Sequence, residues 1–345
     1  MTNTQSTFPD LPPPGPPLRI RVTRGGAPES EHLVACAVAD ADGRLLAAWG
    51  DVARPVFPRS AMKALQSLPL VESGAAAACA ASDRELALAC ASHSGEAAHV
   101  NVVGPWLQRL GLGPDDLVCG PHWPYNADAA RDLAVAGLVP IRLHNNCSGE
   151  HAGMLATARH LHEPVAGYVA PDHPVQQRIT AAVAEMCGMV AAEFIVGVDG
   201  CSAPALALPL HRLAHGMARF GAPDGLSATR AAACRTLARA IAAEPLMVGG
   251  TGRFDTALIQ AAGGRLLSKT GAEGVFVVVV PERRMALALK VQDGATRAAE
   301  AAVLALLRGM DLLDGPAVAA IEAVANPVLS NWAGLPVGTI GLVRD

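Results

Sequence analysis

The chain has 345 residues, 51% of them hydrophobic, which is enough for a sizeable core in one large domain or two. Its formal net charge is −4 and no stretch is rich in lysine and arginine, which argues against a nucleic-acid partner. Aromatic residues make up only 3%, and no apolar run approaches the roughly 18 residues of a transmembrane helix. We therefore expect a soluble globular protein without a membrane partner.

Residues 1–17 are polar and rich in proline, without the charged and apolar regions of a signal peptide. We predict a disordered N-terminal arm there. Eight cysteines are scattered along the chain without the dense spacing of a disulfide framework. This usage favours the reducing cytoplasm, where cysteines are buried hydrophobes, metal ligands or nucleophiles.

The first predicted element is a β-hairpin, with strands at 33–39 and 45–49 joined by the turn residues 40–43. A helix is expected to open near Ser60, because Pro58 suits a helix start and apolar residues follow at helical intervals until Pro69. From Val100 to about Ala262 the pattern is mostly helical. Helices are expected near residues 100–110, 151–161, 174–187, 204–220 and 227–243.

After residue 262 the period changes, and a second hairpin is expected with strands at 274–280 and 285–291, followed by a helix over 295–308. Strands at both ends and helices between them predict an α+β fold, an α/β sandwich. It would have one mainly antiparallel sheet built from both termini and an inserted helical lobe. The sheet lobe would span about 18–57 and 262–345, and the helical lobe about 58–261.

Ser60 and Lys63 are three residues apart, so a helix places both side chains on one face. A serine hydroxyl becomes a good nucleophile only when a base removes its proton. A lysine serves as that base when burial or a neighbouring positive charge lowers its pKa. The same spacing also occurs on ordinary solvated helix faces, so its context matters.

Two further groups supply that context. Ser92 lies in the small polar cluster 91–96, and Lys269 begins a Lys-Thr-Gly sequence just before the strand at 274–280. Alone, the first suits a cap or turn and the second a solvated strand edge. Together with Ser60 and Lys63, in this order, they match the pattern of penicillin-recognising serine enzymes.

A candidate metal site combines Cys147 and Glu150, within one helical turn, with the more distant Cys201. Thiolates and a carboxylate are suitable zinc ligands, although the paired Cys-x-x-Cys pattern is absent and structural cysteines remain an alternative.

The chain resembles the thermolabile, rhizobial-type L-asparaginases, the asparaginase II family, from about Glu31 to its C-terminus. Seven ordered blocks carry the resemblance: 59–63, 91–96, 145–149, 197–204, 250–256, 269–275, and 326–328 with 331–332. It implies a single asparaginase domain over 18–345 with a fold similar to serine β-lactamases and glutaminases, a homodimer, and hydrolysis of L-asparagine to L-aspartate and ammonia through an aspartyl-enzyme intermediate.

By position, the resemblance implies that Ser60 is the nucleophile, Lys63 its proton acceptor, and Ser92 and Lys269 a second pair. It also implies a zinc held by Cys147, Cys201 and a lysine, but this chain has Glu150 where the family has that lysine. A carboxylate binds zinc more commonly than an amine does. The change of charge could also raise the pKa of a nearby lysine and weaken it as a base.

Candidate substrate-binding residues are Arg59, which could hold the α-carboxylate, Asp199, which could hold the ammonium group, and Asn146. Each could instead have only a structural role. A glutaminase stays open as an alternative, since one methylene discriminates by only about 1 to 3 kcal/mol. A β-lactamase or D-alanyl peptidase would be expected to carry an export signal. A catalytically silent metal-binding homologue is the remaining alternative, with Glu150 as its best support.

Overall fold

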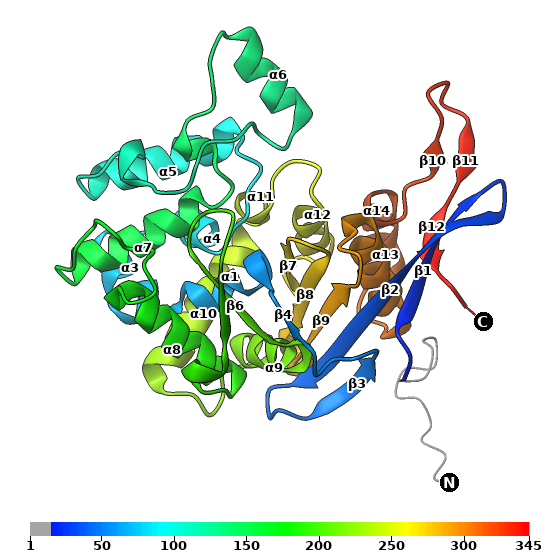
Figure 1. The fold of residues 1–345 in the computed structure, drawn as a ribbon, viewed down its shortest axis with the longest axis horizontal. Helices are drawn as coiled ribbons and strands as arrows, with labels where there is room; N and C mark the ends of the chain where they lie inside the picture. Colours follow the sequence, from blue (N-terminus) through cyan, green and yellow to red (C-terminus); the bar gives the residue numbers. More distant parts are fainter. Residues whose placement is uncertain (1–14, 345) are drawn as a thin grey trace.

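The structure, a computed structural model, describes residues 15–344, and the predicted arm lies outside the described residues over 1–14 (Figure 1). Residues 15–17 lead into the fold. The backbone of Gly15 donates to the carbonyl of Ala48 and accepts from Gly50, which ties this part of the chain to strand β3 (Leu45–Trp49).

One seven-stranded sheet dominates, in the order β12-β1-β2-β9-β8-β7 with β3 paired to β2, and every pairing in it is antiparallel. The first and last of its strands in sequence are neighbours, so both termini build the sheet, as predicted. The α+β prediction is confirmed. Its other strands are β1 (Leu18–Arg24), β2 (Ala27–Asp40), β7 (Leu267–Gly271), β8 (Val275–Val280), β9 (Met285–Val291) and β12 (Ile340–Leu342).

Five short strands form two smaller sheets, ordered β4-β6-β5 and β10-β11. They are β4 (Pro55–Val56), β5 (Ile195–Val198), β6 (Pro204–Pro209), β10 (Leu329–Ser330) and β11 (Pro336–Gly338). The predicted helix at 204–220 is therefore wrong over its first six residues. Residues 204–208 are all buried, so they show no polar face from which a strand can be told from a buried helix.

The other predicted helices are confirmed within a few residues at their ends, and several short ones were not predicted. No helix within residues 15–344 is long and apolar enough to cross a membrane. The α-helices are α1 (Lys63–Gln66), α2 (Leu68–Glu72), α3 (Ala75–Ala78), α4 (Asp83–Ala89), α5 (Ala97–Arg109), α6 (Ala127–Val135), α7 (Ser148–His160), α8 (Pro174–Cys187), α9 (Leu210–Gly221), α10 (Ala228–Ala243), α11 (Pro245–Val248), α12 (Phe254–Ala261), α13 (Thr296–Gly309) and α14 (Gly315–Ala325). The 3₁₀ helices are η1 (Arg59–Met62), η2 (Pro114–Asp116), η3 (Arg142–His144), η4 (Ala191–Glu193) and η5 (Pro281–Arg283).

The sheet has a hydrophobic core on each face, because alternate residues of a strand point to opposite sides. Along β2, Ala37 belongs to the core shared with α9 and the middle helices, whereas Cys36 and Val38 belong to the core shared with α13 and α14. In Figure 1, α9 crosses the central strands, and the contacts of α13 with β12, β1, β2, β8 and β9 place α13 and its neighbour α14 against the opposite face. Of the α-helices between the two groups of strands, α12 packs with α14 on that opposite face, and the others except α6 contribute to the α9 core.

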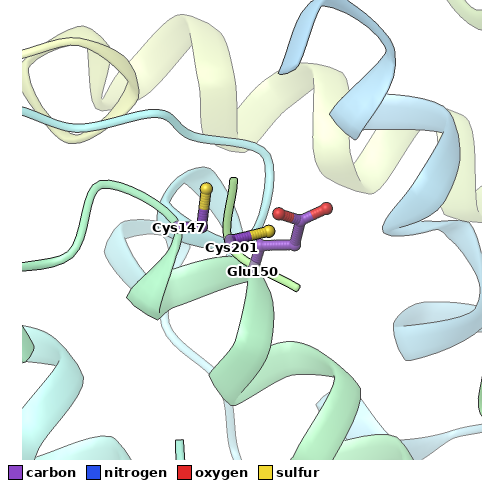
Figure 2. A group of neighbouring side chains, drawn as sticks. All are labelled: Cys147, Glu150 and Cys201. Atoms are coloured by element: carbon purple, nitrogen blue, oxygen red, sulfur yellow. The ribbon is translucent and has the colours of Figure 1, made fainter. Parts of the chain in front are cut away.

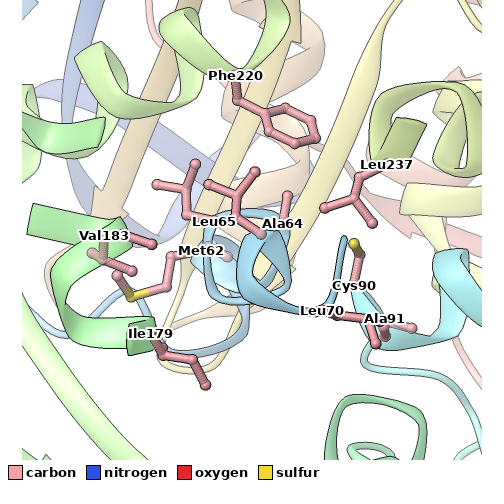
Figure 3. Close-up of a cluster of buried hydrophobic side chains, with 14 of the residues drawn as sticks. Met62, Ala64, Leu65, Leu70, Cys90, Ala91, Ile179, Val183, Phe220 and Leu237 are labelled. Atoms are coloured by element: carbon pink, nitrogen blue, oxygen red, sulfur yellow. The ribbon is translucent and has the colours of Figure 1, made fainter. Parts of the chain in front are cut away.

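The turn that carries Ser60 rests on the first of these cores. Figure 3 shows Met62 and Leu65 pointing into a cluster with Ile179 and Val183 of α8 and Phe220 of α9. Met62 and Leu65 are at most 1% exposed. Burying such side chains contributes roughly 1.5 to 3 kcal/mol each, so the position of this turn is strongly specified by packing.

Candidate active site

Ser60 lies in the 3₁₀ turn η1, which leads directly into α1 at Lys63, rather than in one continuous α-helix. Side chains three residues apart still share a face in such a turn. Arg59, just before the serine, has a φ of 53°, a left-handed conformation that a non-glycine residue adopts at some cost in energy. The Ser60 side chain is half-buried. Within residues 15–344, its hydroxyl takes part in no hydrogen bond.

The Lys63 amine lies in a pocket of acceptors. Its Nζ donates to the carbonyl of Ala91 at 2.7 Å, to Cys147 Sγ at 3.0 Å and to Ser92 Oγ at 3.3 Å. It also lies 3.0 Å from Oε2 of Glu150 in an ion pair whose two side chains are 3% and 4% exposed. The second serine of the pattern is therefore bound to Lys63.

The anionic neighbours decide the charge of Lys63. Burial alone would lower its pKa, but the Cys147 thiolate and the Glu150 carboxylate raise it above the ordinary value. Cys147 is the thiolate of its pair, since a hydrogen bond from Cys201 lowers its pKa to about 6. Burial raises the pKa of Glu150 to about 7, against the opposing effect of Lys63. Without a metal ion on Cys147 and Glu150, this pocket favours the ammonium form of Lys63.

Ser92 follows α4 and is itself buried. Its backbone donates to the carbonyl of Val248, and Ser94 Oγ donates to the carbonyl of Gly249 at 3.0 Å. Thr251 donates to Glu96 from both its backbone and its hydroxyl. These bonds fasten the loop around Ser92 to the loop at 248–251.

Lys269 lies in β7, the strand at one edge of the sheet, and this strand packs directly on the Ser60 turn. The contact is so close that a Cβ on Gly271 would come within 2.2 Å of the carbonyl oxygen of Pro58. Only glycine fits there, which gives the Lys-Thr-Gly sequence a steric reason. The strand, the turn and the Ser92 loop thus converge, as their order in the sequence predicted.

The Lys269 amine differs from that of Lys63. Its side chain is 5% exposed, and Nζ donates to the carbonyl of Thr270 at 2.8 Å. Burial lowers its pKa to about 8, the carboxylate of Asp255 opposes that change, and the charge of Lys63 adds to it. About a tenth of this amine is therefore neutral at pH 7, far more than for a lysine with the ordinary pKa of 10.5.

Cys147, Glu150 and Cys201 form a buried group whose ligand atoms lie within 4.8 Å of one another. Figure 2 shows Glu150 in the first turn of α7, Cys147 at the residue just before that helix, and Cys201 on a separate segment. A void of about 10 Å³, bordered by Lys63, Glu150 and Cys201, adjoins them. Two sulfurs and one carboxylate suit zinc, so these residues fit a metal ion.

Arg59 and Asp199 bind each other rather than standing free. The guanidinium donates from Nε to Oδ2 at 2.5 Å and from Nη2 to Oδ1 at 2.8 Å. Burial alone would raise the pKa of Asp199, but Arg59 holds it below its ordinary value. A cavity of about 750 Å³ opens beside Arg59, along Phe57, Val198 and Lys290, yet Ser60 and Lys269 do not line it.

Asn146 is half-buried beside Cys147, and its other neighbours were not predicted from the sequence. Its backbone donates to Nε2 of His122 at 2.9 Å, and the His122 ring stacks on Tyr125 with centroids 4.8 Å apart. The guanidinium of Arg253 lies 5.9 Å from the centre of the Tyr125 ring. Tyr125 is one of only two tyrosines in the chain, which is the one signal that could have drawn attention to it.

Comparisons with known proteins extend this description. A family model described as L-asparaginase II matches residues 20–342. A comparison with curated proteins finds no match. Among solved structures, a beta-lactamase from Mycobacterium bovis is 16% identical, with 85% of this chain and 95% of that chain covered and a TM-score of 0.41. A D-alanine carboxypeptidase from Burkholderia cenocepacia is 15% identical, with coverages of 81% and 93% and a TM-score of 0.39.

Proposed function

Because the chain belongs to the L-asparaginase II family, we propose that it hydrolyses L-asparagine to L-aspartate and ammonia. The observation that carries this proposal is the convergence of the Ser60 turn, the Ser92 loop and the Lys269 strand, which brings a half-buried serine and two buried lysines into one region. A hydroxyl and an amine that can be neutral are the parts that acyl transfer from an amide needs.

In this proposal Ser60 is the nucleophile, and Lys63, Ser92 and Lys269 complete the catalytic set. The sequence analysis assigned the serine proton to Lys63, but that amine is held protonated by Cys147 and Glu150. Lys269 is the better base near neutral pH because its pKa is about 8. Lys63 then acts as a fixed positive charge that also orients the Ser92 hydroxyl.

The first half of the reaction forms an ester. The Ser60 oxygen attacks the side-chain carboxamide carbon of asparagine while its proton moves to the neutral Lys269 amine. Backbone N–H groups at Ser60 and in the strand after Lys269 would stabilise the oxyanion, an effect worth about 3 to 4 kcal/mol per donor. The carbon–nitrogen bond then breaks, and the leaving nitrogen takes a proton from the Lys269 ammonium to depart as ammonia.

The second half hydrolyses the aspartyl-enzyme ester. A water molecule attacks the ester carbonyl and gives one proton to Lys269, which is neutral again after ammonia has left. The carbon–oxygen bond to Ser60 breaks, and the proton returns to the serine as aspartate leaves. The same amine therefore works as base and acid in turn, which suits a group with a pKa close to the working pH.

Zinc is proposed as a bound ion, held by Cys147, Glu150 and Cys201. When bound, it would neutralise the negative charge of these ligands beside the catalytic groups. Glu150 replaces the lysine that the family resemblance implies at this position, so the ligand set of this chain is more anionic than the family's. An anionic set favours binding of a divalent cation.

Arg59, Asn146 and Asp199 are proposed to shape the substrate site. Arg59 uses Nε and Nη2 to bind Asp199, so its Nη1 can still donate to a substrate carboxylate. Both carboxylate oxygens of Asp199 already accept a hydrogen bond from Arg59. L-Glutamine is the alternative substrate, one methylene longer. A homodimer and a cytoplasmic location are further proposals that follow from the sequence.

The test is ammonia release from L-asparagine and from L-glutamine by purified protein, with and without added zinc. Ser60→Ala is the control, and we expect it to reduce release by about 10⁴-fold or more. Release from asparagine that survives in Ser60→Ala would contradict the serine mechanism. No release from either amide under any condition would favour a catalytically silent homologue, and Glu150→Lys would then be the next protein to assay.

A further inference from the structure

Asp255 is a buried carboxylate that the proposed reaction does not use. It lies in the first turn of α12 and is 1% exposed. Its Oδ1 accepts the backbone N–H of Thr270 at 2.7 Å, and its carbonyl accepts the hydroxyl of Ser268 at 3.3 Å. One residue therefore binds the neighbours of Lys269 on both sides.

This arrangement compensates for the position of β7 at the edge of the sheet. Strand β7 pairs only with β8, so the backbone groups on its other side have no strand to bind. A buried N–H without an acceptor costs about 1 to 3 kcal/mol, and the Asp255 carboxylate supplies the acceptor for Thr270. The bond also fixes the position of the backbone next to Lys269.

Asp255 also belongs to the segment that joins the other catalytic loop. The next residue, Thr256, accepts the backbone N–H of Gly250 at 3.0 Å through its hydroxyl oxygen. That loop in turn accepts a hydrogen bond from Ser94 and donates two, from Thr251, to Glu96. The segment 248–256 therefore links the Ser92 loop to the Lys269 strand through an unbroken series of hydrogen bonds.

Charged groups from several elements surround this contact. The field at Lys269 comes from Asp255 and Arg253 of α12, from Lys63 of α1 and from Cys147 before α7. Glu300 of α13 and Arg253 face Asp255 from its other side, with Arg253 Nη2 3.9 Å from Asp255 Oδ2. Asp255 is the first of the charges acting on Lys269, and it favours the ammonium form.

We propose that Asp255 is a positioning residue for Lys269, because its hydrogen bonds to Ser268 and Thr270 fix the edge strand on both sides of the lysine. The inference rests on the proposed function for its catalytic meaning, but the structural hold on Lys269 can be measured without turnover. Because Asp255 favours the ammonium form, removing its charge leaves the amine neutral at lower pH.

The experiment compares Asp255→Asn, which keeps an oxygen acceptor for Thr270 but loses the charge, with Asp255→Ala, which loses both. The primary readout is the rate at which Lys269 is trinitrophenylated by trinitrobenzenesulfonate between pH 6 and 10, followed by mass spectrometry of the peptide that contains Lys269 after digestion. The matched control is Asp314→Asn, because Asp314 accepts the backbone N–H of Ala317 at the start of another helix, α14. Ammonia release is measured across the same pH range.

We expect the pH of half-maximal labelling of Lys269 to fall by about half a unit or more in Asp255→Asn and to stay unchanged in Asp314→Asn. The pH profile of ammonia release should shift by the same amount. Asp255→Ala should lower kcat by about 100-fold with a smaller change in KM, because the base is misplaced rather than the substrate site lost.

Unchanged labelling of Lys269 in Asp255→Asn would overturn the inference, even in a fully active enzyme. A labelling shift in a protein that releases no ammonia from asparagine would overturn the proposed function instead and leave the hold of Asp255 on Lys269 in place. The two failures are therefore distinguishable by one set of variants.

Discussion

The pockets of Lys63 and Lys269 have the same degree of burial and opposite electrostatics. Lys63 is 3% exposed and Lys269 is 5% exposed. Around Lys63 stand a thiolate, a carboxylate and a backbone carbonyl within 3.0 Å, and its pKa is raised. Around Lys269 burial prevails over Asp255, and its pKa falls to about 8.

The contrast shows that burial alone does not make a lysine a base. Desolvation lowers the pKa of both amines, and in the Lys63 pocket Coulomb attraction to Cys147 and Glu150 outweighs it. A pair of lysines can therefore divide two tasks, with one amine permanently charged and the other free to exchange a proton. The variants below test whether Lys63 stays charged and Lys269 exchanges a proton.

The largest expected effect is on turnover in Lys269→Arg. A guanidinium stays protonated at any pH that a protein survives, so it cannot accept the Ser60 proton. We expect kcat to fall by about 10³-fold or more, the scale of losing a general base. Lys63→Arg keeps the charge of its pocket and should lose less. Steady-state ammonia release at pH 8 compares the two variants, and a greater loss in Lys63→Arg would reverse the division proposed here.

The next effect is on stability, in Lys63→Met. The variant removes the cation that faces Cys147 and Glu150 and leaves two buried anionic side chains without it. Removing one partner of a buried pair costs about 3 kcal/mol or more of unfolding free energy. Urea unfolding at pH 7 measures it, with Lys290→Met as the control, since Lys290 is only half-buried and binds backbone carbonyls. An unchanged midpoint would mean that Glu150 and Cys147 are neutral in the native protein.

Much of the fold was predictable because its main signals are local. The hairpins of β2 with β3 and of β8 with β9 join strands through short turns, and the helices α8, α10 and α13 have clear apolar stripes. The pairing of β1 with β12 joins residues more than 300 positions apart, and nothing local in either strand indicates it. Residues 204–208 lack polar positions altogether, which hid β6.

The sequence predicted which segments come together at the candidate site. It predicted the atomic contacts within the site less well. Motif order brought Ser60, Lys63, Ser92 and Lys269 into one region. The partner of Lys63 depends on where Cys147 and Glu150 arrive in space, which follows from the packing of α7 against α4 rather than from spacing. Asp255 lies in block 250–256 of the family resemblance but was given no role there, and His122 lies outside every block; single polar residues in loops and helix starts are common.

Lys269→Met should change stability in the opposite direction from Lys63→Met. The folded pKa of about 8 lies below the unfolded value of 10.5, so the native amine resists protonation and costs stability at neutral pH. The cost is complete below pH 8 and disappears as the pH rises toward 10.5. Replacing the amine by an apolar side chain should therefore stabilise the protein by about 3 kcal/mol at pH 7.

That gain should shrink by about 2 to 3 kcal/mol between pH 7 and pH 10, since wild type recovers its stability as both states lose the proton. Urea midpoints of the two proteins at these pH values give the comparison. The control is Arg265→Met at the same two pH values, because the exposed guanidinium of Arg265 stays charged throughout this range. A gain that stays constant with pH would show that Lys269 titrates normally in the native state.

Measuring zinc affinity tests whether the carboxylate of Glu150 is a metal ligand. Glu150→Gln keeps the shape of the side chain but gives up a charged ligand, so we expect zinc to bind at least about tenfold more weakly. Equilibrium dialysis with metal analysis measures the affinity, and Cys201→Ser should weaken binding further. Glu193→Gln is the control, because that exposed carboxylate only caps the backbone of Val190. Equal zinc affinity in wild type and Glu150→Gln would assign the metal to the cysteines alone.

The smallest expected effect concerns the pair of Arg59 and Asp199, which borders the Lys63 pocket without entering it. Arg59→Lys cannot hold both carboxylate oxygens of Asp199 at once, because an ammonium group lacks the planar fork of a guanidinium. We expect KM for asparagine to rise about fivefold to tenfold, roughly 1 to 1.4 kcal/mol, with kcat nearly unchanged. Steady-state kinetics with Arg54→Lys as the control separate the two constants, since Arg54 lines the neighbouring cavity without an ion pair among the described residues. A fall in kcat instead of a rise in KM would mean that the left-handed backbone at Arg59 positions Ser60, and that this pair serves the nucleophile rather than the substrate.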